Sequence, residues 1–215
     1  MKARPILFSG DMVRAILDGR KTQTRRLVSK QKYPYGTWAT PEEVAAEFVH
    51  DTRAFMPPLG TIGHRLWVRE TWAAVDWCDD SKPSDFGSAV WYLADNSGPH
   101  AAAAIPYKTD KRGKWRPSIH MPRWASRIDL EITAVRVERV QEITEEDAKK
   151  EGLERITFLG DTFWKLAAPI RRQEGGETIG TLDAKIAFQN LWQSIYANWD
   201  ANPWVWVYEF RRIKP

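Results

Sequence analysis

The segment that most constrains how this chain folds is the run of eight residues from Gly19 to Arg26, in which a glycine is followed only by cations, threonines and a glutamine. Because the run has no aliphatic side chain to bury, it has little to contribute to a core. It is typical either of a functional site or of a solvated basic edge strand, where lysine and arginine discourage aggregation. The pattern alone leaves both interpretations open.

The residues on either side predict how this segment is presented. Before it, the spacing of apolar residues predicts a short helix with one apolar face and with Ser9 as its N-cap. Gly19 lies at the position where a glycine in the left-handed conformation commonly ends a helix. After it, we expect a strand from Thr22 to Val28. Strict alternation along that strand would put Lys21 and Thr24 on opposite faces. The two can act together only if the strand starts after Lys21, if a bulge intervenes, or if the long lysine side chain reaches across.

Composition narrows the class of protein. With 43% hydrophobic and 28% charged residues in 215, the chain can bury a sizeable core. The 32 lysines and arginines against 28 acidic residues favour anionic partners without requiring nucleic acid. One cysteine and four histidines exclude an internal disulfide and offer no ligand-spaced cluster, so we expect a reducing compartment, no metal and no cofactor. With no signal-peptide core and no long apolar run, the protein is expected to be cytoplasmic, without a membrane partner.

Hydrophobic periodicity predicts the elements around the polar segment. Strands are expected at residues 65–72, 90–93, 128–140 and 204–210, and helices at 41–48, 144–152 and 182–199. Irregular stretches near residues 29–62, 73–114 and 154–181 are expected to be insertions. The prediction is therefore one α+β domain, residues 1–215, that carries three long loop insertions.

One carboxylate is predicted to point toward the core. Glu70 lies on the same side of its expected strand as Leu66 and Val68. A buried carboxylate needs a cation or hydrogen-bond donors. We therefore expect an arginine partner for Glu70, and a direct substrate contact is the alternative.

Basic and aromatic residues alternate in the loop from Lys114 to Arg127, where two prolines exclude regular structure. Such a loop can offer phosphate contacts and stacking faces to a nucleic acid. The alternative is a rigid loop that packs Trp124 on the core and leaves its arginines in water. The candidate binding residues in this part of the chain are Arg69, Glu70, Trp115, Arg116, His120, Arg123, Trp124 and Arg127.

An acidic residue, Glu151, stands in the last turn of the expected helix 144–152, where basic residues are favoured. Thr144 is predicted to cap this helix and Gly152 to end it. An anion that faces the negative end of a helix is favoured in its protonated form, which suits a proton donor. An exposed helix-end glutamate is the alternative interpretation.

Four motifs in order along the chain resemble the ASCH domain family of the PUA-like superfamily. They are Gly-x-Lys-Thr-x-Thr-x-Arg at residues 19–26, Leu-Trp-Val-Arg-Glu at 66–70, Ile-Thr-x-x-x-Ala-x-x-Glu-Gly at 143–152 and Trp-Val-Tyr-Glu-Phe at 206–210. The segments that match cover somewhat over half of the chain. The Ser-Ile-His-Met-Pro-Arg-Trp loop is similar to that of proteins encoded by bacteriophages and prophages. The resemblance implies a PUA-like β-barrel with flanking helices.

The resemblance also implies an activity, because compact bacterial ASCH enzymes are amidohydrolases that remove the acetyl group from N4-acetylcytidine. It implies that Lys21, Thr24 and Glu151 are catalytic. Lys21, with a pKa lowered by burial and nearby arginines, would take the proton of the Thr24 hydroxyl, which attacks the acetyl carbonyl. Glu151 would then donate a proton to the leaving amine and afterwards activate water. The remaining candidate substrate contacts are Arg20, Arg25 and Arg26.

Two other functions stay open at this point, since other ASCH proteins are described as RNA-binding modules or ribonucleases. The first is a non-catalytic RNA-binding or nucleic-acid-binding module that uses the 114–127 loop. The second is a metal-independent ribonuclease in which Lys21 contacts the scissile phosphate. The expected partner is accordingly a modified nucleoside or a nucleic acid, in the cytoplasm of a bacterial host if the protein is phage-encoded. The oligomeric state is left open.

Overall fold

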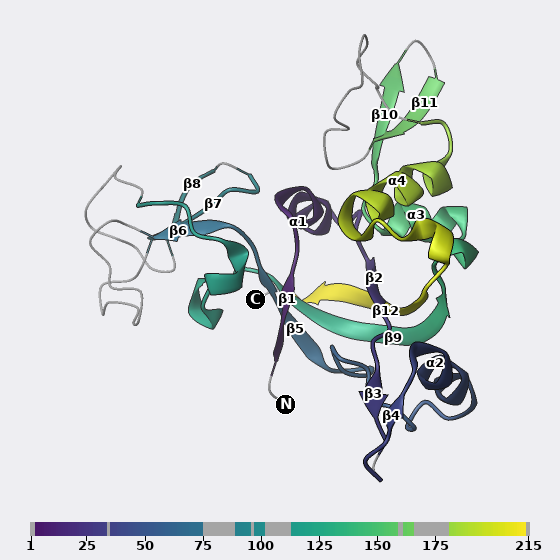
Figure 1. Cartoon of the computed structure of the whole chain (residues 1–215). Coiled ribbons are helices and arrows are strands. Elements are labelled where there is room, and N and C mark those ends of the chain that lie inside the picture. Colours follow the sequence, from purple (N-terminus) through teal and green to yellow (C-terminus); the bar gives the residue numbers. More distant parts are fainter. Residues whose placement is uncertain are drawn as a thin grey trace. The chain divides into compact units, whose positions relative to one another are not determined.

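The computed structural model describes residues 3–33, 35–74, 89–95, 97–101, 113–158, 161–165 and 181–213 (Figure 1). These residues form a mixed α+β structure with several sheets, none of which closes into a barrel among the described strands. The barrel expected from the resemblance stays a prediction. The chain divides into two compact units: unit 1 is Met1–Arg14, Arg65–Leu130 and Ile213–Pro215, and unit 2 is Ala15–His64 and Glu131–Arg212.

Unit 1 contains a parallel strand pair and a short antiparallel sheet. Its strands are β1 (Arg4–Leu7), which pairs with β5 (Arg65–Arg69), and β6 (Trp72–Ala74), which pairs with β7 (Ala89–Tyr92) and through it with β8 (Ser97–Ala101). The strand expected at residues 65–72 is thus divided in two at Glu70 and Thr71. The 114–127 loop carries two single 3-10 turns, η1 (Ser118–His120) and η2 (Arg123–Ala125), each preceded by a proline.

A hydrophobic cluster of unit 1 lies between this loop and the antiparallel sheet. The buried residues that form it are Trp72, Ala74, Val90, Tyr92, Met121 and Ala125, with Trp124 packed against them. The loop is therefore part of the core on one side, as the rigid-loop alternative predicted.

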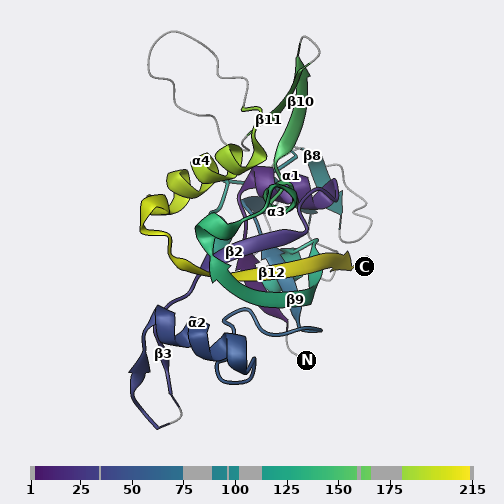
Figure 2. The ribbon, with the colours of Figure 1, turned by 90° about the vertical axis from the view of Figure 1, so that its right-hand side faces the viewer.

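Unit 2 is built on three neighbouring strands, β2 (Gln23–Leu27), β12 (Trp204–Ile213) and β9 (Asp129–Arg139), which Figure 2 shows side by side in that order. β9 begins in unit 1 and continues into unit 2. The antiparallel register of β2 and β12 places Thr24 opposite Tyr208 and Arg25 opposite Val207. Val205, Trp206, Val207 and Tyr208 are all buried, so β12 is covered on both faces. Its buried aromatic residues Trp206 and Tyr208 are therefore part of the core.

Helices of unit 2 flank these strands. They are α2 (Pro41–His50), α3 (Glu145–Lys150) and α4 (Ala184–Tyr196), whereas α1 (Gly10–Leu17) begins in unit 1 and ends in unit 2. Phe48 of α2 packs edge-on against Trp206, with ring centroids 4.7 Å apart. α3 lies against α4 (Figure 1). The helices predicted at 41–48, 144–152 and 182–199 are confirmed, with bounds that differ by a few residues.

The expected insertions contain more structure than their sequences indicated. Residues 29–62 hold a short hairpin of β3 (Gln31–Lys32) and β4 (Trp38–Ala39) in addition to α2. Residues 154–165 form a second hairpin, β10 (Glu154–Phe158) and β11 (Asp161–Lys165), which the sequence did not predict. Two further 3-10 turns are η3 (Val140–Glu142) and η4 (Trp199–Ala201). Much of the 73–114 and 154–181 stretches lies outside the described residues, and whether these are insertions in one domain stays a prediction.

Candidate active site

Lys21 is held in place by the way the chain leaves α1. Gly19 has φ +77°, the left-handed conformation predicted for it, and turns the chain back so that the amides of Arg20 and Lys21 both donate to the Ala15 carbonyl oxygen. Lys21 then forms an isolated antiparallel bridge with Glu151. Because β2 begins at Gln23, the strand starts after Lys21, which is one of the three conditions for Lys21 and Thr24 to act together.

Glu151 is positioned by the end of α3. The Thr144 hydroxyl accepts a hydrogen bond of 3.1 Å from the Asp147 amide, which confirms the predicted N-cap. Glu151 is the C-cap residue, and Gly152 follows with φ +97°. This backbone puts the Glu151 side chain beside Lys21 instead of in solvent. The exposed-glutamate interpretation is therefore wrong.

Lys21 and Glu151 form a buried ion pair. Lys21 Nζ donates three hydrogen bonds of 2.8 Å, to Glu151 Oε2, to the Glu151 carbonyl oxygen and to the Gln23 carbonyl oxygen. An ammonium has three protons to donate, so these contacts match its capacity. The two residues are only 2% and 4% exposed. Burial lowers the pKa of Lys21 from 10.5, an effect that the negative charge of Glu151 opposes.

This lowered pKa predicts how stability depends on pH. From the lowered pKa up to 10.5, the unfolded chain holds a proton on Lys21 that the folded chain has released. The free energy of unfolding should therefore rise with pH across that interval. Urea unfolding at a series of pH values, on wild type and Lys21→Met, measures the effect. The methionine variant should lack this rise, and parallel curves for the two proteins would contradict the assignment.

The second oxygen of Glu151 is also occupied by a cation. Glu151 Oε1 accepts a hydrogen bond of 3.0 Å from Arg25 Nη1. Both carboxylate oxygens thus accept from cations, so in this arrangement Glu151 is an acceptor and not the proton donor expected from its place at the helix end. A donor role requires the proton of Lys21 to pass to Glu151 first.

Arg25, which we expected to contact substrate, is buried and fully engaged within the protein. Its Nη1 donates to Gln23 and Glu151, its Nη2 to Glu138 and Asp147, and its Nε to Glu138. These five hydrogen bonds equal the five N–H groups of a guanidinium. At 2% exposure, Arg25 therefore organises the carboxylates of the site and has no donor left for a substrate.

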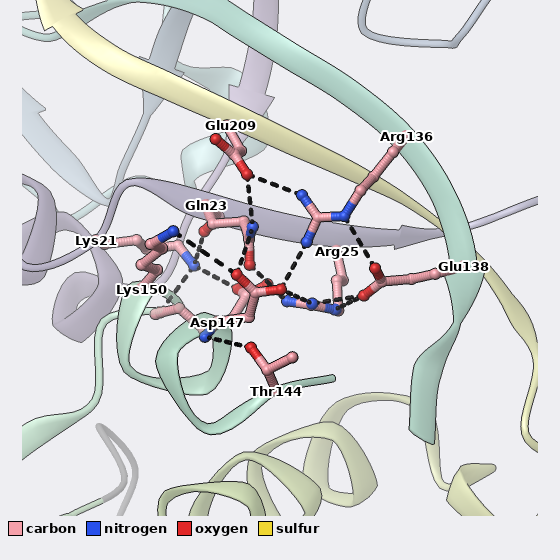
Figure 3. A network of polar contacts seen from close by, with 10 residues as sticks. Lys21, Gln23, Arg25, Arg136, Glu138, Thr144, Asp147, Lys150 and Glu209 are labelled. Carbon is pink, nitrogen blue, oxygen red and sulfur yellow. Dashed lines mark hydrogen bonds and ion pairs between the residues drawn. The ribbon is translucent and has the colours of Figure 1, made fainter. Parts of the chain in front are cut away.

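A network of charged side chains surrounds Arg25 (Figure 3). Arg136 of β9 donates to Glu138 at 2.9 Å, to Glu209 at 2.8 Å and to Asp147 at 2.6 Å. Gln23 contributes longer hydrogen bonds of 3.3 Å to Asp147 and Glu209. The network thus holds three buried or half-buried cations, Lys21, Arg25 and Arg136, among four carboxylates. Sequence reasoning did not assign Gln23, Arg136, Glu138, Asp147 and Glu209 to the site.

Thr24 lies on the other face of β2 from this network. Side chains alternate along a strand, and the contacts of Gln23 and Arg25 place both of them on the network face. Thr24 is only 2% exposed, and its neighbour across the strand pair is Tyr208, whose hydroxyl accepts from the Leu59 amide. The structure therefore brings Lys21 and Glu151 together, and it places Thr24 on the adjoining strand without joining its side chain to the pair.

The two remaining arginines of the polar segment differ in their surroundings. Arg20 donates from Nη1 to the carbonyl oxygens of Gly152 and Leu153, and its Nη2 lies 2.9 Å from Asp18. Arg20 therefore braces the turn after α3, and a substrate contact by it stays a prediction. Arg26 is half-buried opposite Trp206.

Gly152 makes room for Lys21. A Cβ atom at position 152 would lie 2.9 Å from the Cβ atoms of Lys21 and Ala15, in addition to the strain of φ +97°. We expect Gly152→Ala to lower the free energy of unfolding by about 1–3 kcal/mol. Gly19→Ala is the matched control, because Gly19 also has a positive φ but a Cβ atom added there would meet nothing within 4 Å. In urea denaturation, equal losses for the two variants would contradict the crowding at Gly152.

The candidate residues in unit 1 make mostly internal contacts. Glu70 is 1% exposed and receives hydrogen bonds of 2.9 and 3.0 Å from Arg127, which confirms the expected arginine partner. Burial raises the pKa of Glu70, and Arg127 opposes that shift. Arg127 also pairs with Asp95 and lies over the Tyr92 ring at 3.9 Å. Glu70 and Arg127 therefore have structural partners within the protein, and a binding role for them stays a prediction.

Two more candidates from the loop also have structural partners. Arg123 Nη2 donates to both oxygens of Asp129 at 2.7 Å. Trp124 packs edge-on against Trp72 with ring centroids 5.8 Å apart, so its ring is part of the core and not a stacking platform. Arg69 lies over the Trp67 ring and donates to the Ile119 carbonyl oxygen.

The last three candidates share one surface feature. Trp115, Arg116 and His120 line a pocket of about 410 Å³ together with Trp72, Pro117 and Pro122. The sequence-predicted residues thus fall into two groups, one around Lys21 in unit 2 and one at this pocket in unit 1.

The described residues contain no group of three or more histidine, cysteine, aspartate or glutamate side chains placed to hold a metal ion. The clustered carboxylates around Arg25 are instead paired with cations. Among the helices that the structure describes, none has the length and apolar character needed to cross a membrane.

Comparisons with known protein families, with curated proteins and with solved structures gave no match.

Proposed function

We propose that this protein is an ASCH-type hydrolase that cleaves an amide on a modified cytidine, with N4-acetylcytidine as its substrate. The observation that carries the proposal is the buried Lys21–Glu151 pair, in which a lysine of lowered pKa contacts a carboxylate at 2.8 Å. Lysines with lowered pKa and a specific charge partner are characteristic of catalytic sites. The same proposal includes a catalytic role for the Gly-x-Lys-Thr-x-Thr motif. It also includes a PUA-like barrel that forms one domain with three insertions.

The proposed reaction begins with a proton shift inside the pair. When the proton moves from Lys21 Nζ to Glu151, both side chains become neutral, a form that burial favours. Neutral Lys21 is then a base and protonated Glu151 an acid. Arg25 stays bonded to Glu151 Oε1 and keeps the carboxyl group oriented.

Thr24 supplies the nucleophile in this scheme. Its hydroxyl oxygen attacks the acetyl carbonyl carbon while its proton passes to Lys21, and the carbon–N4 bond breaks as Glu151 protonates N4. Cytidine leaves, and the acetyl group stays on Thr24. Glu151 then takes a proton from a water molecule, whose oxygen attacks this ester. The bond between the acyl carbon and the Thr24 oxygen breaks as Lys21 returns its proton to that oxygen, and acetic acid leaves and ionises to acetate. Because Thr24 lies on the opposite face of β2, the scheme requires substrate binding to bring Lys21 Nζ to it.

The first test is release of cytidine from N4-acetylcytidine by purified wild-type protein, followed by liquid chromatography against a heat-denatured control. Stoichiometric cytidine and acetate are expected. Failure of folded protein to release either product would contradict the proposal.

The ribonuclease alternative stays a prediction with less support from the site. It requires Lys21 to contact a phosphate, and the three hydrogen bonds of Lys21 Nζ are directed to protein oxygens within the interior.

A further inference from the structure

We infer that the pocket lined by Trp72, Trp115, Arg116, Pro117, His120 and Pro122 in unit 1 binds a nucleotide, that is, an aromatic base that carries a phosphate. This inference does not depend on the hydrolase proposal, because the pocket and its residues are described within unit 1 alone. The pocket, called the Trp115 pocket below, measures about 410 Å³, which lies in the range of sites for small organic ligands.

Aromatic walls give the Trp115 pocket a preference for flat ligands. Trp115 is half-buried, so part of its indole is exposed, and Trp72 is buried behind it. The Arg116 guanidinium lies over the Trp72 ring with its carbon atom 5.2 Å from the ring centroid. Indole rings and a guanidinium plane are the groups on which nucleobases stack.

The polar groups of the pocket suit an anion. Among the residues that the structure describes, its lining includes Arg116 and the exposed His120 and contains no carboxylate. Among the acidic side chains of the described loop and sheet, Glu70 and Asp95 pair with Arg127, and Asp129 pairs with Arg123. A phosphate in the pocket would meet the positive charge of Arg116. Arginine also binds phosphate oxygens with two parallel hydrogen bonds.

The pocket is rigidly built before any ligand arrives. Arg116 is bound to β6 by two backbone hydrogen bonds with Trp72, of 2.8 and 3.2 Å. Pro117 and Pro122 start the two 3-10 turns that frame the pocket, and the intervening Met121 is 1% exposed in the core. A preformed site loses little conformational entropy on binding. This distinguishes the pocket from a mobile loop that happens to carry basic residues.

Together, stacking faces and a cation at one preformed pocket match a single nucleotide. The nucleotide can be free in solution or part of a single-stranded nucleic acid, and both present the same base and phosphate. Binding to the base distinguishes this site from a general basic patch, which attracts phosphates regardless of what they carry.

The test is fluorescence anisotropy of a short fluorescein-labelled cytidine oligoribonucleotide, with cytidine monophosphate and ribose phosphate as competitors. Trp115→Ala should weaken binding about tenfold, the usual loss for one stacked base. Arg116→Gln should weaken binding and reduce the slope of log affinity against log salt by about 0.7. Arg211→Gln, which removes an exposed arginine of unit 2 that is not in the pocket, is the charge-matched control and should bind like wild type. Thermal melting checks that each variant is folded.

The competitors identify the source of the nucleotide. Competition by cytidine monophosphate at concentrations comparable to the oligonucleotide supports a free nucleotide, and competition by the oligonucleotide alone supports a single strand. The inference is overturned if wild type binds neither, if folded Trp115→Ala binds as tightly as wild type, or if ribose phosphate competes as well as cytidine monophosphate. None of these outcomes depends on hydrolysis, so failure here leaves the proposed activity untouched.

Discussion

Replacing Lys21 by methionine is expected to lower the rate of N4-acetylcytidine hydrolysis by about 10³-fold, the usual contribution of one acid–base group. Methionine keeps much of the length and volume of lysine but has no nitrogen to accept the Thr24 proton. Arg25 still pairs with Glu151 in this variant, so the carboxylate is not left without a cation. Initial rates at saturating substrate measure the effect. Lys149→Met on α3 is the control, because Lys149 pairs at the surface with Glu145 and should keep wild-type rates.

The same rates test the role of Thr24, whose side chain lies on the other face of β2 from Lys21 and Glu151. Thr24→Val preserves the shape of this buried side chain and removes the hydroxyl, whereas Thr24→Ser preserves the hydroxyl. We expect the valine variant to lose activity by about 10³-fold and the serine variant to keep most of it. If both variants lose activity equally, Thr24 acts through packing. If the valine variant stays active while Lys21→Met does not, the attacking group is water and the acyl-enzyme step is wrong.

Replacing Arg25 by methionine is expected to lower the free energy of unfolding by about 3–5 kcal/mol, since breaking a buried ion pair leaves uncompensated charge. The variant removes all five hydrogen bonds of the guanidinium and takes a cation from Glu138, Asp147 and Glu151. Urea denaturation gives the difference. Arg211→Met is the matched control: its pair with Glu131 is 2.9 Å long but 69% of the Arg211 side chain is exposed. Such a surface pair contributes about 0–1 kcal/mol.

Arg25→Lys separates charge from geometry. A lysine keeps the positive charge but has three donors on one nitrogen, so it cannot reproduce the planar fork that reaches Glu138 and Glu151 together. We expect the free energy of unfolding of Arg25→Lys to lie between those of the wild type and of Arg25→Met. If Arg25→Met unfolds at the same urea concentration as Arg211→Met, the network is not the structural centre that its burial indicates.

Local signals predicted the local parts of this site well. Gly19 was expected in the left-handed conformation because it follows an apolar-periodic helix, and Gly152 was expected to end the helix that Thr144 caps. Both glycines have a positive φ and stand just after a helix. Thr144 was expected to cap α3 from the residues that follow it, and it does. These outcomes depend on a few neighbouring residues, which a sequence displays directly.

Partner choice was harder to predict, because it depends on residues distant in the chain. Judged by its neighbours in the sequence, Arg25 resembles a phosphate-binding arginine. In the structure it pairs with Glu138, 113 positions away, and is buried in a network. A signal for this was present: Arg136 and Glu138 stand two apart on a long strand between apolar residues, so they share one face. Arg127 also pairs with residues distant in the chain, Glu70 and Asp95, and only 16% of its side chain is exposed. Trp115 and Arg116 line a pocket in unit 1, and their contact with a ligand stays a prediction.

The central claim is tested most directly by mass-spectrometric product analysis of N4-acetylcytidine incubated with wild-type protein and, side by side, with Lys21→Met. The account predicts free cytidine and acetate from the wild type and no more than the uncatalysed background from the variant, with both proteins folded by circular dichroism. Equal product from the two proteins would show that Lys21 is not catalytic. No product from either would contradict the amidohydrolase function itself.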